Sequence, residues 1–126
     1  MHLRIGNGEE HKETLQTAGN LAMSLNCLRR FEETRSLLRK TMPVAQRVLG
    51  ECHDTTLRMG SLYAKALCRD PNATLDDLRK AVTMLEDTTR TARRVLGSAH
   101  PLTKATESDT QRARLVLRAS ETPGSA

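Results

Sequence analysis

Aromatic side chains are nearly absent from this 126-residue chain: Phe31 and Tyr63 are the only two, and there is no tryptophan. The core must therefore be built from leucine, alanine, valine and methionine, which favours closely packed helices over a β-sandwich. No apolar run approaches the roughly 18 to 20 residues that a membrane span needs. Residues 1–4 likewise lack the apolar core of a signal peptide. The composition predicts an all-α domain with no membrane segment.

Cysteine is also scarce, and its three positions, Cys27, Cys52 and Cys68, have no Cys-x-x-Cys spacing. An odd number without such spacing argues against a disulfide framework and indicates a reducing compartment, so we predict a soluble, cytoplasmic protein. The formal net charge is +5. Both halves of the chain share the excess of cations, so it is not a basic tail.

A short motif recurs three times, around His11, His53 and His100, which lie 42 and then 47 residues apart. The residues before the second and third copies also match: Ala45–Gly50 corresponds to Ala92–Gly97. Gapped copies of one pattern over most of a chain are typical of a repeat protein.

Apolar residues three and four apart predict five helices, at about 11–28, 31–49, 54–68, 75–96 and 100–119. Gly50 is placed to end the second helix, and Thr74 to begin the fourth with Asp77 three residues on. Pro43 lies inside the second helix, where we expect a kink; an early end and restart is the other possibility.

The repeats then divide the domain at 1–119 into a first repeat at about 9–50, a second at about 51–97 and a capping helix at about 100–119. Residues 120–126 read as a disordered tail. Residues 3–8 look like the last turn of a preceding helix, which would make the chain the C-terminal piece of a longer array.

Several short stretches carry a resemblance to a known repeat family. The matching residues are Gly50, His53, Thr56 and Leu57 at the junction, Asn20-Leu21-Ala22, Phe31-Glu32-Glu33, and Arg94-Val95-Leu96-Gly97. Over about residues 3–103 the pattern resembles the 42-residue tetratricopeptide repeat of the kinesin-light-chain type. It departs from that pattern at Leu62, where the family has Asn, and it lacks the heptad segment of a kinesin light chain.

The resemblance implies a right-handed α-solenoid of antiparallel helix pairs, about two and a half repeats in five helices. The first helix of each pair would line a concave groove, and the second would form the convex back. The function it implies is that of a protein–protein interaction scaffold.

The sequence lacks the motifs of common catalytic and nucleotide-binding sites. The sequence has no nucleophile elbow, P-loop or dinucleotide-binding motif, so we predict no enzyme activity and no cofactor. Equivalent histidines of stacked repeats lie roughly 10 Å apart, too far for one metal ion. We expect them to tie the junction turns by hydrogen bonds. We expect Cys27 and Cys68 to act as small apolar fillers; the other possibility is that they are reactive thiols.

The candidate binding residues lie on the predicted groove. They are Gln16, Asn20, Met23, Asn26 and Cys27 in the first helix, Arg58, Ser61, Leu62, Lys65 and Arg69 in the third, and Arg112 in the fifth, with Asp109 the one acidic residue. Cations and amides in this pattern suit an acidic peptide, whose carboxylates the cations would hold while Met23 anchors an apolar side chain. The other interpretation is that the cations merely solvate an open face.

A different class of function stays open. The array could be a structural, regulatory or self-associating segment of a larger protein, meeting a neighbour or a second copy through the exposed N-terminal face. Nucleic-acid binding is not expected, because the aromatic side chains needed for base stacking are missing.

Overall fold

The computed structural model describes residues 8–121, and within this range the chain forms five α-helices and no strand. The helices are α1 (Gly8–Cys27), α2 (Phe31–Val48), α3 (Asp54–Arg69), α4 (Leu75–Leu96) and α5 (Pro101–Glu121). The predicted all-α class is confirmed. Helix α1 begins earlier than predicted, and α5 runs through residues 120 and 121, which had been assigned to the tail. The predicted helical turn at residues 3–7 and the rest of the tail lie outside the described range.

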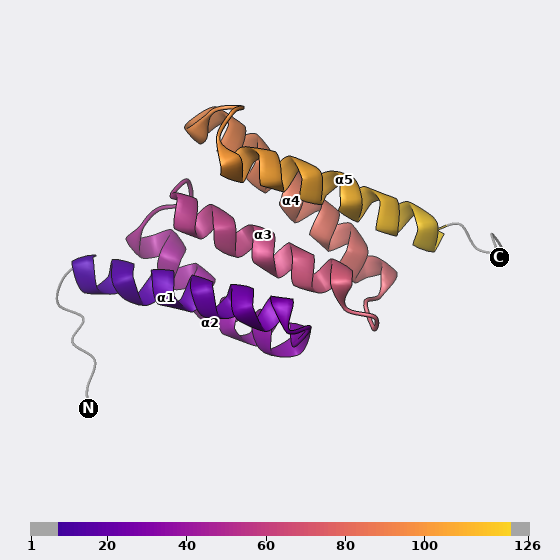
Figure 1. Cartoon of the computed structure of the whole chain (residues 1–126), viewed down its shortest axis with the longest axis horizontal. Coiled ribbons are helices and arrows are strands. Elements are labelled where there is room, and N and C mark those ends of the chain that lie inside the picture. Colours follow the sequence, from indigo (N-terminus) through magenta and orange to yellow (C-terminus); the bar gives the residue numbers. More distant parts are fainter. Residues whose placement is uncertain (1–7, 122–126) are drawn as a thin grey trace.

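The helices are arranged as successive antiparallel pairs. Helix α3 packs against each of the other four, whereas α2 and α4 each pack on their neighbours along the chain. Figure 1 shows α1, α3 and α5 side by side in one layer, with α2 and α4 behind them. This is the helical-repeat architecture that the sequence predicts.

Small residues bring the helices close together. Ala22, Ala64 and Ala81 are fully buried where helices meet, and Leu38 and Leu85 fill the space between them. Burying a leucine side chain stabilises the fold by about 1.5–3 kcal/mol on a transfer scale. The core therefore needs no aromatic cluster, as the composition suggests.

The turns follow local signals in the sequence. Gly50 and Gly97 adopt positive φ angles of 97° and 94° just after α2 and α4, a conformation that costs glycine least. Thr74 begins α4 with a full capping box: its hydroxyl accepts from the Asp77 N–H, and the Asp77 carboxylate accepts from the Thr74 N–H. These predicted boundaries are confirmed.

Helix α2 continues through Pro43 to Val48. An early end and restart at this proline is therefore wrong. Pro43 and Arg39 are both exposed, so water can replace the backbone donor that proline removes from the Arg39 carbonyl. None of the described helices is both long and apolar enough to cross a membrane.

Candidate peptide-binding face

The layer of α1, α3 and α5 carries the residues predicted to bind a peptide (Figure 1). We call it the A face. Helix α3 lies in the middle, with α1 and α5 packed on either side of it. Any ligand lying across the A face would therefore meet α3 centrally.

The predicted residues differ widely in their exposure. Those that are exposed are Gln16, Asn20, Met23, Cys27, Arg69 and Arg112; Arg58 and Lys65 are half-buried; Asn26, Ser61 and Leu62 are buried. Most of the predicted binding residues therefore lie at the surface, whereas three of them are buried.

Asn26 is predicted to lie on the groove, but the structure buries its side chain. The buried stripe of α1 contains Leu15 and Ala22, whereas Leu21 is 50% exposed. Asn26 lies one turn beyond Ala22 and is only 2% exposed, and its side-chain oxygen has no hydrogen-bond partner. It belongs to the core side of α1.

Ser61 and Leu62 are buried because α3 is covered by helices from both neighbouring repeats. The Ser61 hydroxyl donates to Asp109 Oδ2 over 3.3 Å. Lys65 lies 3.8 Å from the same carboxylate oxygen. Asp109 therefore links α5 to α3 and neutralises part of the predicted basic stripe.

A small enclosed cavity of about 30 Å³ lies between α3 and α5, lined by residues that include Lys65, Cys68, Arg69, Asp109 and Arg112. Burial, together with the nearby Asp109 carboxylate, raises the pKa of the Cys68 thiol to about 11. This thiol is protonated at neutral pH and is a poor nucleophile. The cavity nevertheless gathers three of the predicted cations in one place.

Arg69 has a partner that sequence reasoning missed. Its guanidinium lies 5.5 Å from the centre of the Phe31 ring, and that of Arg29 lies 5.3 Å from the same ring. Such cation–π contacts contribute about 0.5–1 kcal/mol at exposed sites. Arg29 precedes Phe31 in the α1–α2 turn with a φ of 62°, and no local pattern in the sequence links it to Arg69.

Of the predicted binding cations, Arg58 and Arg112 are the two without a side-chain partner among the described residues. Within residues 8–121 neither makes an ion pair or a hydrogen bond through its side chain. An unpaired guanidinium offers five N–H donors in a planar fork that matches a carboxylate. These two residues are the part of the predicted site most available to an acidic ligand.

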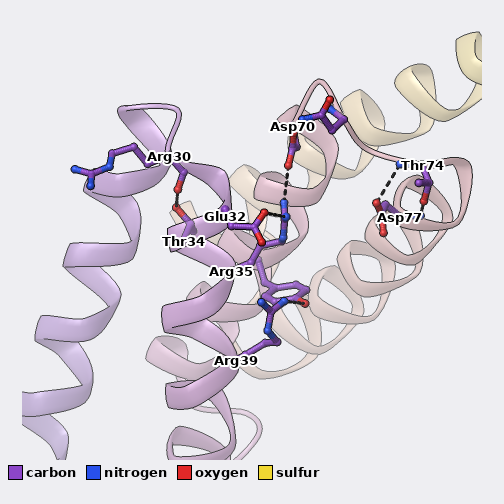
Figure 2. A network of polar contacts seen from close by, with 10 residues as sticks. Arg30, Glu32, Thr34, Arg35, Arg39, Asp70, Thr74 and Asp77 are labelled. Carbon is purple, nitrogen blue, oxygen red and sulfur yellow. Dashed lines mark hydrogen bonds and ion pairs between the residues drawn. The ribbon is translucent and has the colours of Figure 1, made fainter.

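The other side of the repeat holds a structural ion-pair network (Figure 2). Arg35 Nη1 donates to Asp70 Oδ2 over 2.9 Å, and Arg35 Nη2 donates to the exposed Glu32 over the same distance. Asp70 Oδ1 also accepts from the Asn72 N–H. Hydrogen bonding from Arg35, and then from the Asn72 backbone, holds the pKa of Asp70 below its usual range. This network joins α2 to the α3–α4 turn.

Two of the three repeated histidines hold junction turns. His53 Nδ1 accepts from the Thr55 N–H over 3.1 Å, and His100 Nδ1 accepts from the Leu102 N–H over 3.0 Å. The predicted role is confirmed for both. His11 differs because α1 begins at Gly8 and places it inside the helix. Within the described range, no three histidine, cysteine or carboxylate side chains converge as a metal site would require.

The sequence model of the tetratricopeptide repeat family matches residues 14–54 and 73–102, which together are more than half of the chain. The chain therefore belongs to the tetratricopeptide repeat family, a non-catalytic type of scaffold whose repeats generally mediate protein–protein interactions. The unmatched stretch between the two matches holds α3, where Leu62 departs from the expected pattern. No curated protein and no solved structure was found to match the chain.

Proposed function

We propose that this chain is a protein–protein interaction module that takes an acidic peptide across the A face. The observation that carries the proposal is that two guanidinium groups of the predicted set, Arg58 on α3 and Arg112 on α5, have no side-chain partner among the described residues. Lys65 and Arg69 are also on α3, and their charges add to the positive potential of the A face. The exposed amides of Gln16 and Asn20 on α1 supply donors and acceptors for a peptide backbone.

The kinesin-light-chain type of repeat and a cytoplasmic location belong to the same proposal. All three cysteines are free thiols, which fits a reducing compartment.

The test uses a variant that changes the face without disturbing the fold. Lys65→Glu is unsuitable, because it would place a carboxylate beside Asp109, and Arg69→Glu would remove a contact with Phe31. The double variant Arg58→Glu and Arg112→Glu avoids both problems. A matched control reverses Arg47 and Arg94, two exposed arginines of α2 and α4.

The assay is fluorescence polarisation with a library of labelled synthetic peptides rich in Asp and Glu, at two salt concentrations. We expect selected peptides to bind the wild type and the control variant, and to lose at least about tenfold in affinity with the double variant. Equal binding by both variants would refute the groove, because a general effect of net charge would then explain the affinity.

A second candidate function rests on a different observation. Leu21 on α1 is 50% exposed and Leu28, in the turn just after α1, is 65% exposed, and the sequence from Thr14 to Leu28 contains no charged residue. An exposed helix face without charge suits self-association, because two copies can meet there without repulsion. Sedimentation equilibrium under reducing conditions tests this: a mass that rises with concentration, and that Leu21→Lys with Leu28→Lys returns to the monomer, would support it.

A further inference from the structure

The single tyrosine of the chain lies where three helices meet, away from the A face. Tyr63 comes from α3 and is only 7% exposed. Arg39 of α2 reaches its hydroxyl, with Nη1 at 3.4 Å from the phenolic oxygen. Lys80 of α4 places its ammonium group 5.8 Å from the ring centre. Two cations from different helices therefore converge on one buried phenol.

The charges of this cluster are not balanced. Within residues 8–121 neither Arg39 nor Lys80 has a carboxylate partner. Arg35, one turn before Arg39 on the same helix, is instead held by Asp70 and Glu32 (Figure 2). Two like charges without an intervening anion repel each other, so an anion placed between them would be stabilised by both.

The hydroxyl of Tyr63 has hydrogen-bonding capacity to spare. It accepts a hydrogen bond from Arg39, and its own proton finds no acceptor among the described residues. A phenol can donate while it accepts. A bound anion would satisfy this donor and would receive hydrogen bonds from the guanidinium and the ammonium as well.

The Tyr63 cluster does not itself line a cavity between α2 and α4, but that cavity begins about one helical turn further along both helices. Helices α2 and α4 both pack on α3 and, within the described range, not on each other. A cavity of about 340 Å³ lies between them; Met42, Gly60 and Met84 line it, and so do the acidic Glu51 and Asp87. Met42 follows Arg39 by one turn of α2, and Met84 follows Lys80 by one turn of α4. The two cations and the two methionines are therefore neighbours along α2 and α4.

We propose that Arg39, Lys80 and the Tyr63 hydroxyl bind the phosphate group of a phosphorylated protein segment, with an apolar side chain of that segment between Met42 and Met84. A phosphate monoester carries a charge of about −1.5 to −2 at neutral pH. It therefore satisfies two cations and a donor, whereas a carboxylate carries one charge. One helical turn rises about 5 Å, the length of one or two residues of extended chain. The apolar residue would thus lie one or two positions from the phosphorylated one.

The composition of the chain provides a direct reporter for this site. Tyr63 is the one tyrosine and there is no tryptophan, so the intrinsic fluorescence comes from the site itself. We expect inorganic phosphate, added at constant ionic strength against sodium chloride, to change this fluorescence in a saturable way. A wild-type signal that phosphate does not change, or that changes without saturation, would overturn the proposal.

Four variants separate the site from a general effect of charge. Arg39→Gln and Lys80→Gln should each weaken phosphate binding about tenfold, as the loss of one charge-assisted hydrogen bond predicts. Lys40→Gln is the matched control, because Lys40 is the exposed neighbour of Arg39 and has no partner among the described residues. An equal effect of Lys40→Gln would overturn the site. Tyr63→Phe, followed by calorimetry, should also weaken binding while circular dichroism stays unchanged.

Synthetic peptides then test the source of the phosphate. A peptide with phosphoserine next to leucine should bind more tightly than inorganic phosphate, and more tightly than the same peptide with glycine in place of leucine. The unphosphorylated peptide should not bind. Equal binding of the phosphorylated and unphosphorylated peptides would overturn the proposal. The site lies apart from the A face, so these results are independent of the acidic-peptide groove.

Discussion

Removing the carboxylate of Asp70 should destabilise the protein by an amount that the local geometry sets. Asp70 and Arg35 have side chains that are only 14% and 15% exposed, and their 2.9 Å contact is direct. A hydrogen bond between charged groups contributes about 1.5–3 kcal/mol. The bond from the Asn72 N–H adds about 1 kcal/mol. Asp70→Ala removes both and leaves Arg35 with Glu32, whose side chain is 81% exposed and whose ion pair contributes little.

We therefore expect Asp70→Ala to lower the free energy of unfolding by about 2.5–4 kcal/mol, and the melting temperature by about 10–15 °C. Asp70→Asn should cost about 1.5–3 kcal/mol, because its single amide oxygen can still accept from the Asn72 N–H, whereas its NH2 group then faces the Arg35 guanidinium and cannot accept from it. Urea denaturation followed by circular dichroism measures both values.

The pH dependence supplies the decisive control. The pKa of Asp70 is lowered in the folded state, so its stabilisation is complete above the unfolded pKa of about 3.9 and is lost as the pH falls through the folded value. The gap between wild type and Asp70→Asn should thus be full at about pH 7 and shrink below about pH 4. A gap that stays constant over this range, or an Asp70→Asn variant as stable as wild type at neutral pH, would refute the assigned role of this carboxylate.

Three further predictions concern stability and reactivity. A Cβ at Gly19 or at Gly50 would meet no atom within 4 Å, but Gly50 has a φ of 97°. Thermal melting should therefore show that Gly19→Ala stabilises the protein by about 0.5–1 kcal/mol and that Gly50→Ala destabilises it by about 1–2 kcal/mol. Equal effects of the two substitutions would contradict the backbone argument. The buried hydroxyl of Thr103 has no partner among the described residues, so Thr103→Val should leave the free energy of unfolding unchanged or raise it. The hydroxyl of Thr110 instead bonds to the Thr106 carbonyl and to the Thr89 hydroxyl. Thr110→Val should therefore lower the free energy of unfolding by about 1 kcal/mol in urea titrations. With its pKa raised to about 11, the half-buried Cys68 should react with a thiol reagent at about pH 8 far more slowly than the two exposed cysteines, and three equal rates in the time course would count against its burial.

The sequence by itself determined the five helices and the boundaries that local turn and capping signals set, because those depend on interactions between near neighbours. Gly50 ends α2 because its φ is positive, and Thr74 begins α4 because Asp77 completes a capping box three residues later. The periodic apolar residues and the repeated histidines were enough to predict a tetratricopeptide repeat array, which the family match supports.

Only the tertiary structure decided which side of each helix is buried and which cations find a partner. Helix α1 has leucines on more than one side, so the periodicity alone allowed a register in which Asn26 faced the groove; packing instead buries Ala22 and leaves Leu21 half exposed. Lys65 of α3 forms an ion pair with Asp109 of α5, and Arg69 of α3 makes a cation–π contact with Phe31 of α2. Local sequence cannot fix such contacts, because they depend on the distances and angles at which whole helices pack.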